Sequence, residues 1–525
     1  MTEDFWSNIP LEQRALLTDP ALLYKVKCEL DRSITGEDKN KLLLWLVANS
    51  SYTKTMGNAW NLSAIVTGNS SSGKSWLVNN VLQYFSNVED FTRITGASPD
   101  RLSQDFTNKI LHVEELRGTE PAQATLRVWI SEGHLKLLTT DRDEKGHIIT
   151  RTLETKGFPT FITSATEVEI DSELLNRILI LSMDESLKQT RNVLLFEAKI
   201  YRELGVSNGF SPNPAFKDLG LHLQHITHVI IPYIELLAQK FPIPPGKEIS
   251  VGPRRDFKKM IFLIGVIAWL HQLQRTIVQR GPHVFVVATV ADFFMAWRLL
   301  DESLKNTLLK LTERHKWVLD CFKDSTKSLT VKDVATETEL SESRAREILN
   351  SLVKKGYLSK DESQKTHLYS LKQKVDLDVT IDDFVTSLSS FEETELEKWL
   401  SEQNYKILLA REGPQVIVDP LTGEQFTVNP STRANTILLK MLKRQDLSLN
   451  LQEKFENVTI SAIATSPSFI SLHLVDGGLY PTEKCSLCGK QPVYAQINYP
   501  DGSWGLLCGD CYWKKLKEKQ GETEK

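Results

Sequence analysis

The chain has 525 residues, of which 41% are hydrophobic and 25% are charged. At roughly 150 residues per domain, this length is too great for one domain and indicates about three to four in a soluble globular protein. The 63 Lys and Arg residues face 67 Asp and Glu residues, a formal net charge of -4, which excludes a polycation that binds nucleic acid over its whole surface.

The sequence predicts a cytoplasmic protein with reduced cysteines and no membrane partner. Six cysteines in so long a chain do not form a disulfide scaffold. The N-terminus, Met1-Thr-Glu-Asp-Phe, lacks the apolar core of a signal peptide. The longest apolar stretch, Met260–Leu270, is too short to span a bilayer and favours a buried helix.

The first elements along the chain are helical and then alternate with strands. Leucine and valine recur at helical spacing in residues 1–60, which predicts an N-terminal helical segment. Strand-like and helix-like stretches alternate over residues 61–185, a pattern typical of a parallel α/β sheet. The first of these strands, Asn61–Thr67, runs directly into a loop rich in Gly and Ser. The expected fold class is therefore multidomain α/β.

This loop matches the pattern G-x-x-x-x-G-K-S/T of the phosphate-binding loop (P-loop) in full. Glycines permit backbone angles that direct successive N–H groups at phosphates, and the following helix adds its positive end. We expect Lys74 to contact the β- and γ-phosphates of ATP and Ser75 to bind Mg²⁺. The expected nucleotide-binding residues of the loop are Gly68, Asn69, Ser70, Ser71, Ser72, Gly73, Lys74 and Ser75.

A second strand, beginning at Lys109, ends in two carboxylates, Glu114 and Glu115. We expect Glu114 to orient the magnesium ion with its water, and Glu115 to polarise the attacking water. The usual residue at the first of these positions is Asp, so Glu114 is a departure whose longer side chain could act through a water. An exposed acidic strand end is the alternative interpretation.

Three further features follow in chain order. Residues 135–153 contain two β-rich arms around a polar turn with Gly146, the pattern of a β-hairpin. The strand 160–166 ends in hydroxyls, among which Ser164 is expected to sense the γ-phosphate. Residues 186–320 are expected to form a mostly helical lid, in which Arg254 at the head of a long helix can reach back to the phosphates.

The order of these elements resembles the AAA+ ATPases, most closely the branch that includes the minichromosome maintenance helicases. Residues 34–41 look like the segment before the family's first strand, Glu173–Arg177 is similar to its arginine-finger segment, and Pro253-Arg254 to its second sensor. Residues 20–320, which the likeness covers, also resemble the helicase-type ATPase attached to zinc-finger primases of plasmids and phages.

The resemblance implies a ring, such as a homo-hexamer, in which Arg177 acts on the ATP of a neighbouring copy. It also implies that the hairpin 135–153 projects into a central pore and contacts the DNA backbone. The tip residues Arg142, Lys145 and His147 would make this contact, although acidic residues stand beside them. A purely structural hairpin is the alternative interpretation.

Residues 325–372 have the pattern of a winged helix. A helix begins behind Thr330, a second helix (341–355) carries an apolar face, and two short strands with a polar turn form the wing. Winged helices bind DNA in many proteins and bind protein partners in others, and both interpretations stay open. The residues expected to face DNA are Ser343, Arg344, Arg346, Asn350, Lys354, Lys360 and Lys365.

The C-terminal region contains a cysteine module at residues 484–513. Its two pairs of cysteines, separated within each pair by two residues, have the spacing of a structural Zn²⁺ ribbon. The ligands would be Cys485, Cys488, Cys508 and Cys511. Residues 373–475 suggest no fold, and the acidic run 376–383 is interpreted as solvated rather than as a metal site.

These features predict an ATP-hydrolysing ring motor that acts on single-stranded or forked DNA. The hypothesis is a helicase or helicase-like replication protein of a mobile element, plasmid or virus, with ATP, Mg²⁺ and Zn²⁺ as cofactors. One alternative is an AAA+ remodeller or regulator that assembles on DNA or protein without unwinding. A second is a DNA-binding adaptor whose nucleotide site binds but does not hydrolyse.

Overall fold

The computed structural model divides into two compact units, residues 1–439 and residues 440–525. The residues that the structure describes are 6–53, 62–94, 104–114, 120–142, 147–165, 172–175, 177–203, 211–226, 228–241, 252–309, 313–322, 328–338, 340–354, 357–361, 367–371, 393–410, 415–428, 471–474, 495–498 and 504–507.

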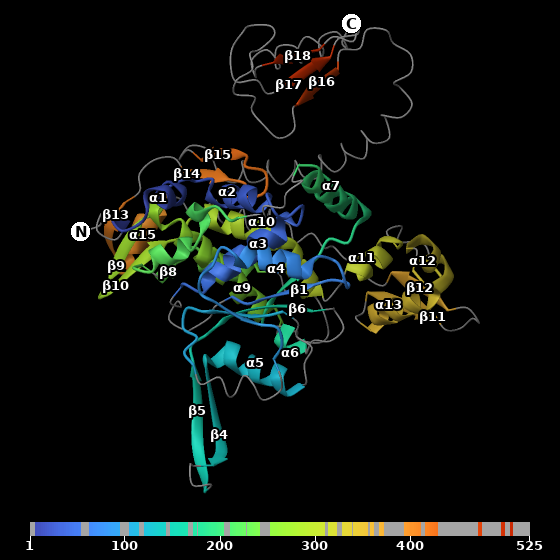
Figure 1. Cartoon of the computed structure of the whole chain (residues 1–525), viewed down its shortest axis with the longest axis horizontal. Helices are drawn as coiled ribbons and strands as arrows, with labels where there is room; N and C mark the ends of the chain where they lie inside the picture. Colours follow the sequence, from blue (N-terminus) through green and yellow to red (C-terminus); the bar gives the residue numbers. More distant parts are fainter. Residues whose placement is uncertain are drawn as a thin grey trace. The chain divides into compact units, whose positions relative to one another are not determined.

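A five-stranded sheet lies at the centre of the first unit, and its neighbouring strands are all parallel, as the alternating pattern predicted (Figure 1). β1, β3 and β6 are buried along their whole length, as expected for strands covered on both faces. The phosphate-binding loop follows β1 and therefore leaves an interior strand. The strand order is β2 (Val88–Phe91), β3 (Ile110–Val113), β6 (Thr160–Ala165), β1 (Ala64–Thr67), β7 (Leu179–Ser182).

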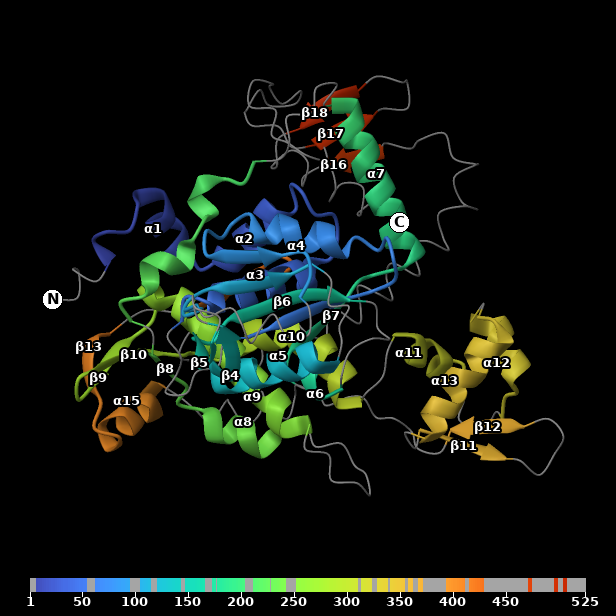
Figure 2. The ribbon, with the colours of Figure 1, turned by 60° about the horizontal axis from the view of Figure 1, so that its bottom comes forward.

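Helices cover both faces of this sheet (Figure 2). α3 (Asp38–Ser50) and α4 (Lys74–Leu82) pack on one face, where Ser50 Oγ lies 3.3 Å from Thr160 Oγ1 of β6. On the other face, α5 (Glu120–Glu132) and α6 (Ser172–Leu175) share one buried apolar cluster with the strands. Burial of these apolar faces is the main stabilising term for such a three-layer arrangement.

Two further helices precede α3, namely α1 (Leu11–Leu17) and α2 (Leu22–Leu30). Leu23, Val26 and Leu30 of α2 are buried, one helical turn apart. The N-terminal residues are therefore helical where their spacing indicates helix.

A long β-hairpin stands between α5 and β6, where residues 135–153 predicted one. β4 (His134–Arg142) pairs antiparallel with β5 (Ile148–Lys156) over their full length. Leu135 at its base is buried, whereas Leu138 and Ile148 are 71% and 73% exposed. The outer part of this ribbon is therefore open to solvent in a single copy of the chain (Figure 1).

Residues 186–320 contain strands as well as the expected helices. The helices and 3-10 turns are α7 (Leu187–Glu203), η3 (Pro214–Phe216), η4 (Leu219–Leu223), α8 (Ile234–Lys240), α9 (Gly252–Leu270), η5 (Gln272–Gln274) and α10 (Val290–Leu309). A second, mixed sheet has the order β13-β9-β10-β8. Its strands are β8 (His228–Ile230), β9 (Ile277–Arg280), β10 (His283–Val287) and β13 (Lys406–Leu409).

The strand β13 comes from the region 373–475, to which the sequence assigned no fold. It follows α15 (Glu393–Glu402) and pairs antiparallel with β9. The next hairpin, β14 (Gln415–Val418) with β15 (Gln425–Val428), is tied to α10 by a buried ion pair, Arg298 Nε to Asp419 Oδ2 at 3.1 Å. Residues 393–428 therefore belong to the same compact unit as the phosphate-binding loop.

The winged helix begins earlier than the expected residue 325. α11 (Glu313–Asp320) precedes α12 (Val331–Thr338) and α13 (Glu342–Lys354), and Val318 and Phe322 are buried in their common core. The sequence pattern did not indicate α11, because most of its residues are polar. The apolar face predicted for the second helix is buried, at Ala345, Ile348, Leu349 and Leu352.

The wing and the helix caps are as expected. β11 (Leu358–Asp361) pairs antiparallel with β12 (Leu368–Leu371). Thr330 N–H donates to Asp333 Oδ2 at 2.8 Å, and Asp333 N–H donates to Thr330 Oγ1 at 3.3 Å. This reciprocal cap satisfies backbone donors that the first turn of α12 leaves unpaired.

The second unit contains a three-stranded antiparallel sheet, β16 (Ser471–Leu474), β17 (Ala495–Asn498) and β18 (Trp504–Leu507). β17 and β18 lie between the two cysteine pairs in the sequence. All four cysteines are outside the described residues. Within the described part of the chain, no helix combines the length and apolar character needed to cross a membrane.

Candidate nucleotide site

The phosphate-binding loop has the backbone that an anion cradle requires. Ser71 has a φ of 66° and Gly73 a φ of 89°, and Gly73 is the N-cap of α4. No side chain caps α4, so the N–H groups of its first turn point out of an open helix end. A helix N-terminus with uncapped N–H groups attracts phosphate through both hydrogen bonds and its dipole. The loop therefore fits a nucleotide phosphate.

Lys74 folds back over this loop. Its Nζ donates to Gly68 O at 2.9 Å and to Asn69 O at 2.6 Å. Ser72 Oγ is buried in the loop without a protein partner. The ammonium group thus lies where the loop begins, and it can exchange these carbonyls for phosphate oxygens, which are stronger acceptors because they are charged.

Glu185 contacts the loop from the segment that follows β7, and sequence reasoning missed it. Its carboxylate accepts from the backbone N–H and from the side-chain amide of Asn69. A Cβ added at Gly68 would lie 2.7 Å from Ser72 Oγ and 3.2 Å from Glu185 Oε1. Gly68 is therefore needed for this close approach. No local pattern marks Glu185, since it is 116 residues from Asn69.

The structure joins two of the other predicted residues, Glu114 and Ser164, at the carboxyl edge of the sheet. Ser164 Oγ donates to Glu114 O at 2.7 Å, and Thr163 Oγ1 donates to Val113 O at 2.8 Å. The hydroxyl expected to sense the γ-phosphate thus also ties β6 to the end of β3. Glu115 lies outside the described residues.

The two predicted arginines occupy different settings. Arg177 Nε donates to Ser131 Oγ at 2.8 Å, and its Nη1 donates to Glu173 O at 2.7 Å. These bonds hold the side chain against α5 and α6 within its own copy of the chain. Arg254 lies in the first turn of α9 with an exposed side chain.

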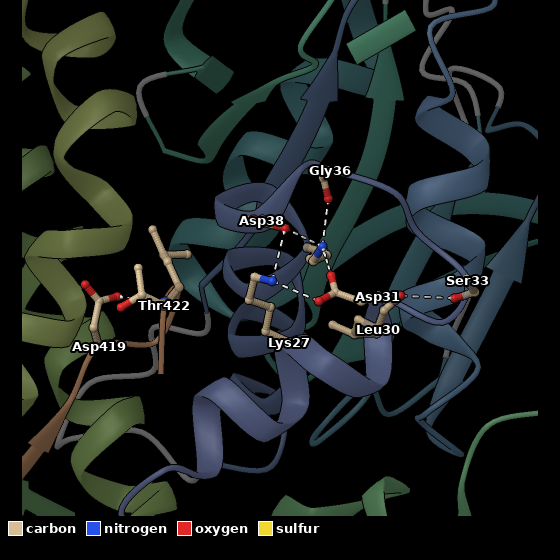
Figure 3. Close-up of polar contacts among 10 residues, drawn as sticks. Lys27, Leu30, Asp31, Ser33, Gly36, Asp38, Asp419 and Thr422 are labelled. Carbon is tan, nitrogen blue, oxygen red and sulfur yellow. Dashed lines mark hydrogen bonds and ion pairs between the residues drawn. The ribbon is translucent and has the colours of Figure 1, made fainter. Parts of the chain in front are cut away.

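A buried lysine, Lys41, binds three oxygens of the segment 31–38, which precedes the loop in sequence. Figure 3 shows Asp31, Gly36 and Asp38 of this segment. Lys41 is 0% exposed, and its Nζ donates to Gly36 O at 2.7 Å and to Asp38 Oδ1 at 2.6 Å, and also to Asp31. Lys27 adds a second ion pair to Asp31 at 2.8 Å. A buried ammonium is tolerated because each of its protons has an oxygen partner.

The same segment and the first turn of α3 are bonded to the end of β7 and to the residues that follow it. Asp184 N–H donates to Glu37 Oε1 at 2.8 Å, and Asn40 Nδ2 donates to Ser182 O at 2.8 Å. Burial raises the pKa of the Glu37 carboxyl above its usual range. Segment 31–38, the phosphate-binding loop and the end of β7 therefore form one connected polar network.

The candidate DNA-binding residues are described in part. In α13, Arg346 and Ser343 are exposed, and Arg344 pairs with Glu347 at 2.6 Å. Asn350 accepts a bond from Tyr369 of the wing at 3.3 Å. Lys145 and Lys365, and the side chains of Arg142 and Lys354, lie outside the described part, whereas His147 is exposed.

Metal ligation has few candidates in the described part of the chain. Among those residues, no group of three or more His, Cys, Asp or Glu side chains could hold a metal ion. Ser75 is exposed at the start of α4 and Glu114 is exposed at the end of β3, so both are open to a phosphate-bound cation. The zinc prediction falls on cysteines outside the described residues.

Comparison with known proteins shows one domain family. Residues 317–362 match the IclR helix-turn-helix domain, so a helix-turn-helix domain is present in the chain. No curated protein sequence matches the chain. Among solved structures, a full-length MCM homolog from Methanopyrus kandleri is similar, with 14% identity and a TM-score of 0.37. The match covers 57% of this chain and 62% of that one, so the chain spans less than two thirds of that protein.

Proposed function

We propose that this chain is an AAA+-type ATPase that acts on DNA as a ring of identical subunits, with helicase or helicase-like activity. The observation that carries the proposal is the open phosphate cradle. The loop has positive φ angles, an uncapped helix α4 behind it and the Lys74 ammonium over it. An acidic strand end and a hydroxyl-bearing strand lie at the same edge of the parallel sheet. Ligand sites in such sheets lie at the carboxyl ends of the strands.

The roles of the residues follow from their chemistry. The N–H groups of residues 71–75 and the Lys74 ammonium bind the phosphates, and Ser75 with Glu114 holds Mg²⁺, which neutralises phosphate charge. Glu115 orients the attacking water, and Ser164 stands beside the γ-phosphate. Arg177 serves a neighbouring copy only if its bonds to Ser131 and Glu173 are exchanged during assembly.

The helix-turn-helix domain supports DNA as the partner. Exposed Arg346 on α13 has the position and charge for a groove or phosphate contact. The hairpin β4–β5 supplies a second contact, and the cysteine module a Zn²⁺ ribbon. A remodeller or regulator that assembles on DNA without unwinding is the second candidate, favoured by the presence of the helix-turn-helix domain itself.

The test is ATP hydrolysis with and without single-stranded and forked DNA. Lys74→Ala should lower turnover about 100-fold or more, because it removes a charge that stabilises the transition state. Arg177→Ala should also lower the turnover of ATP, but only at protein concentrations at which the ring forms. Lys398→Ala, an exposed lysine of α15, is the matched control.

Strand displacement then separates the two candidates. DNA-stimulated hydrolysis with displacement of a labelled strand from a fork supports the helicase. DNA-stimulated hydrolysis without displacement supports the remodeller. A Lys74-dependent rate that is indifferent to DNA and to Arg177 contradicts both, and Glu115→Gln without effect on turnover contradicts hydrolysis at this site.

A further inference from the structure

The residue immediately after Ser75 is a tryptophan in an unusual setting. Trp76 lies in the first turn of α4 and is 59% exposed, whereas Leu77, Val78 and Val81 of the same helix are buried. Exposure of so large an apolar side chain is costly in water, and its usual place is a core or an interface. The position next to the phosphate cradle therefore calls for an explanation.

The indole of Trp76 is also held in place. Its Nε1–H donates to Ser33 O at 2.8 Å, across 43 residues of sequence. Ser33 is 2% exposed and lies in the segment 31–38 (Figure 3), whose Gly36 carbonyl and Asp31 carboxylate accept hydrogen bonds from Lys41. One edge of the ring is thus bonded to the main chain of a buried residue, while more than half of Trp76 remains open to solvent.

The segment beside Trp76 has a shape that leaves little freedom. Gly36 has a φ of +67°, and a Cβ added there would lie 2.2 Å from the side-chain amide of Gln189. Gln189, only 8% exposed, in turn donates to Thr35 O at 2.7 Å. Segment 33–36 therefore packs closely against the start of α7, and the same segment accepts the hydrogen bond of Trp76.

We propose that Trp76 is a stacking platform for the base of the bound nucleotide, with purines preferred. The inference rests on the proposed nucleotide site: phosphates bound by residues 71–75 leave the attached nucleoside next to the first turn of α4. A pinned aromatic ring binds a flat base without losing further rotational freedom, so stacking adds affinity at little entropic cost. Purines present a larger ring face than pyrimidines. In this proposal Trp76 binds the base, and the loop binds the phosphates.

The experiment separates the base from the phosphates. Binding of ADP and of inorganic tripolyphosphate is measured by calorimetry for the full-length wild type and for Trp76→Ala, Trp76→Phe and Lys74→Ala. Trp317→Ala, at a 47% exposed tryptophan of α11, is the control. We expect Trp76→Ala to weaken ADP about tenfold and to leave tripolyphosphate unchanged. Trp76→Phe, which keeps a smaller ring but loses the N–H that pins it, should bind ADP with an affinity between those of the wild type and Trp76→Ala.

Other outcomes overturn the inference. If Trp76→Ala weakens ADP and tripolyphosphate equally, or if Trp76→Phe loses as much as Trp76→Ala, the indole is only a clasp between α4 and Ser33. Equal affinity of the wild type for ADP and for CDP removes the purine preference. If Lys74→Ala weakens neither ligand, the nucleotide site itself is wrong, and this result is independent of Trp76.

Discussion

Glu185 accepts hydrogen bonds from both the backbone N–H and the side-chain amide of Asn69, which ties the phosphate-binding loop to the end of β7. A carboxylate at this place stabilises the loop, because it satisfies two donors. The same negative charge opposes an incoming phosphate. If the loop binds phosphate as proposed, the group that holds the loop in shape therefore also repels the ligand.

Replacement of this carboxylate should strengthen nucleotide binding. We expect Glu185→Gln to lower the Kd for ADP about threefold at low salt, because a unit charge a few ångströms from phosphate costs on the order of 1 kcal/mol in water. The gain should shrink at high salt. Titration calorimetry at two salt concentrations measures it, with exposed Glu197→Gln of α7 as control. Weaker binding in Glu185→Gln would show that the anchoring of the loop outweighs the repulsion.

The buried position of Lys41 should make it important for stability. Lys41→Ala removes three oxygen contacts from a fully buried ammonium, and we expect a loss of about 2 kcal/mol in the free energy of unfolding. Lys25→Ala breaks an ion pair between Lys25 and Asp19 that is partly exposed, and should cost less than about 1 kcal/mol. Urea unfolding compares the two. Similar losses would mean that segment 31–38 is held by other contacts.

His271 should make stability depend on pH. Burial lowers the pKa of His271 to about 4, and Arg275 adds to this effect. Between about pH 6.5 and 4 the unfolded state binds a proton that the folded state excludes, so stability falls as pH decreases through this window and is constant above it. Unfolding of His271→Leu at pH 7 and pH 5 should lack this contribution of about 1–3 kcal/mol. Exposed His147→Gln should keep the wild-type slope.

Arg346 should contribute to DNA affinity through charge. It is exposed on α13, whereas Arg344 is already paired with Glu347. Arg346→Ala should weaken DNA binding by roughly threefold to tenfold and reduce the slope of log affinity against log salt by about 1 if it contacts a phosphate. Fluorescence anisotropy at several salt concentrations tests this, with Lys398→Ala as control. If Arg346→Ala changes neither the slope nor the affinity, the result would favour a protein, rather than DNA, as the partner of the helix-turn-helix domain.

Local patterns in the sequence predicted the elements that local forces specify. The strands β1, β3 and β6 were predicted from apolar runs, whereas β2, which is polar and partly exposed, was not. The loop from Gly68 to Ser75 was predicted from its glycines, and the second helix of the winged helix from the spacing of Ala345, Ile348 and Leu352. Each of these elements depends on the backbone preferences of its residues or on the burial of one of its faces. Both properties are determined by residues that are close together in the sequence.

The tertiary structure alone decided which distant segments meet. The contacts of Glu185 with Asn69, of Trp76 with Ser33 and of Arg298 with Asp419 join residues 116, 43 and 121 positions apart. β13 joins the second sheet through pairing with β9, although the winged helix lies between them in the chain. Such contacts form when packing brings two surfaces together, and no periodicity within either segment records its partner. The backbone conformation of the loop from Gly68 to Ser75 is thus a property of the local sequence. The contacts of Glu185 and Trp76 beside it, and the completed second sheet, are properties of the fold.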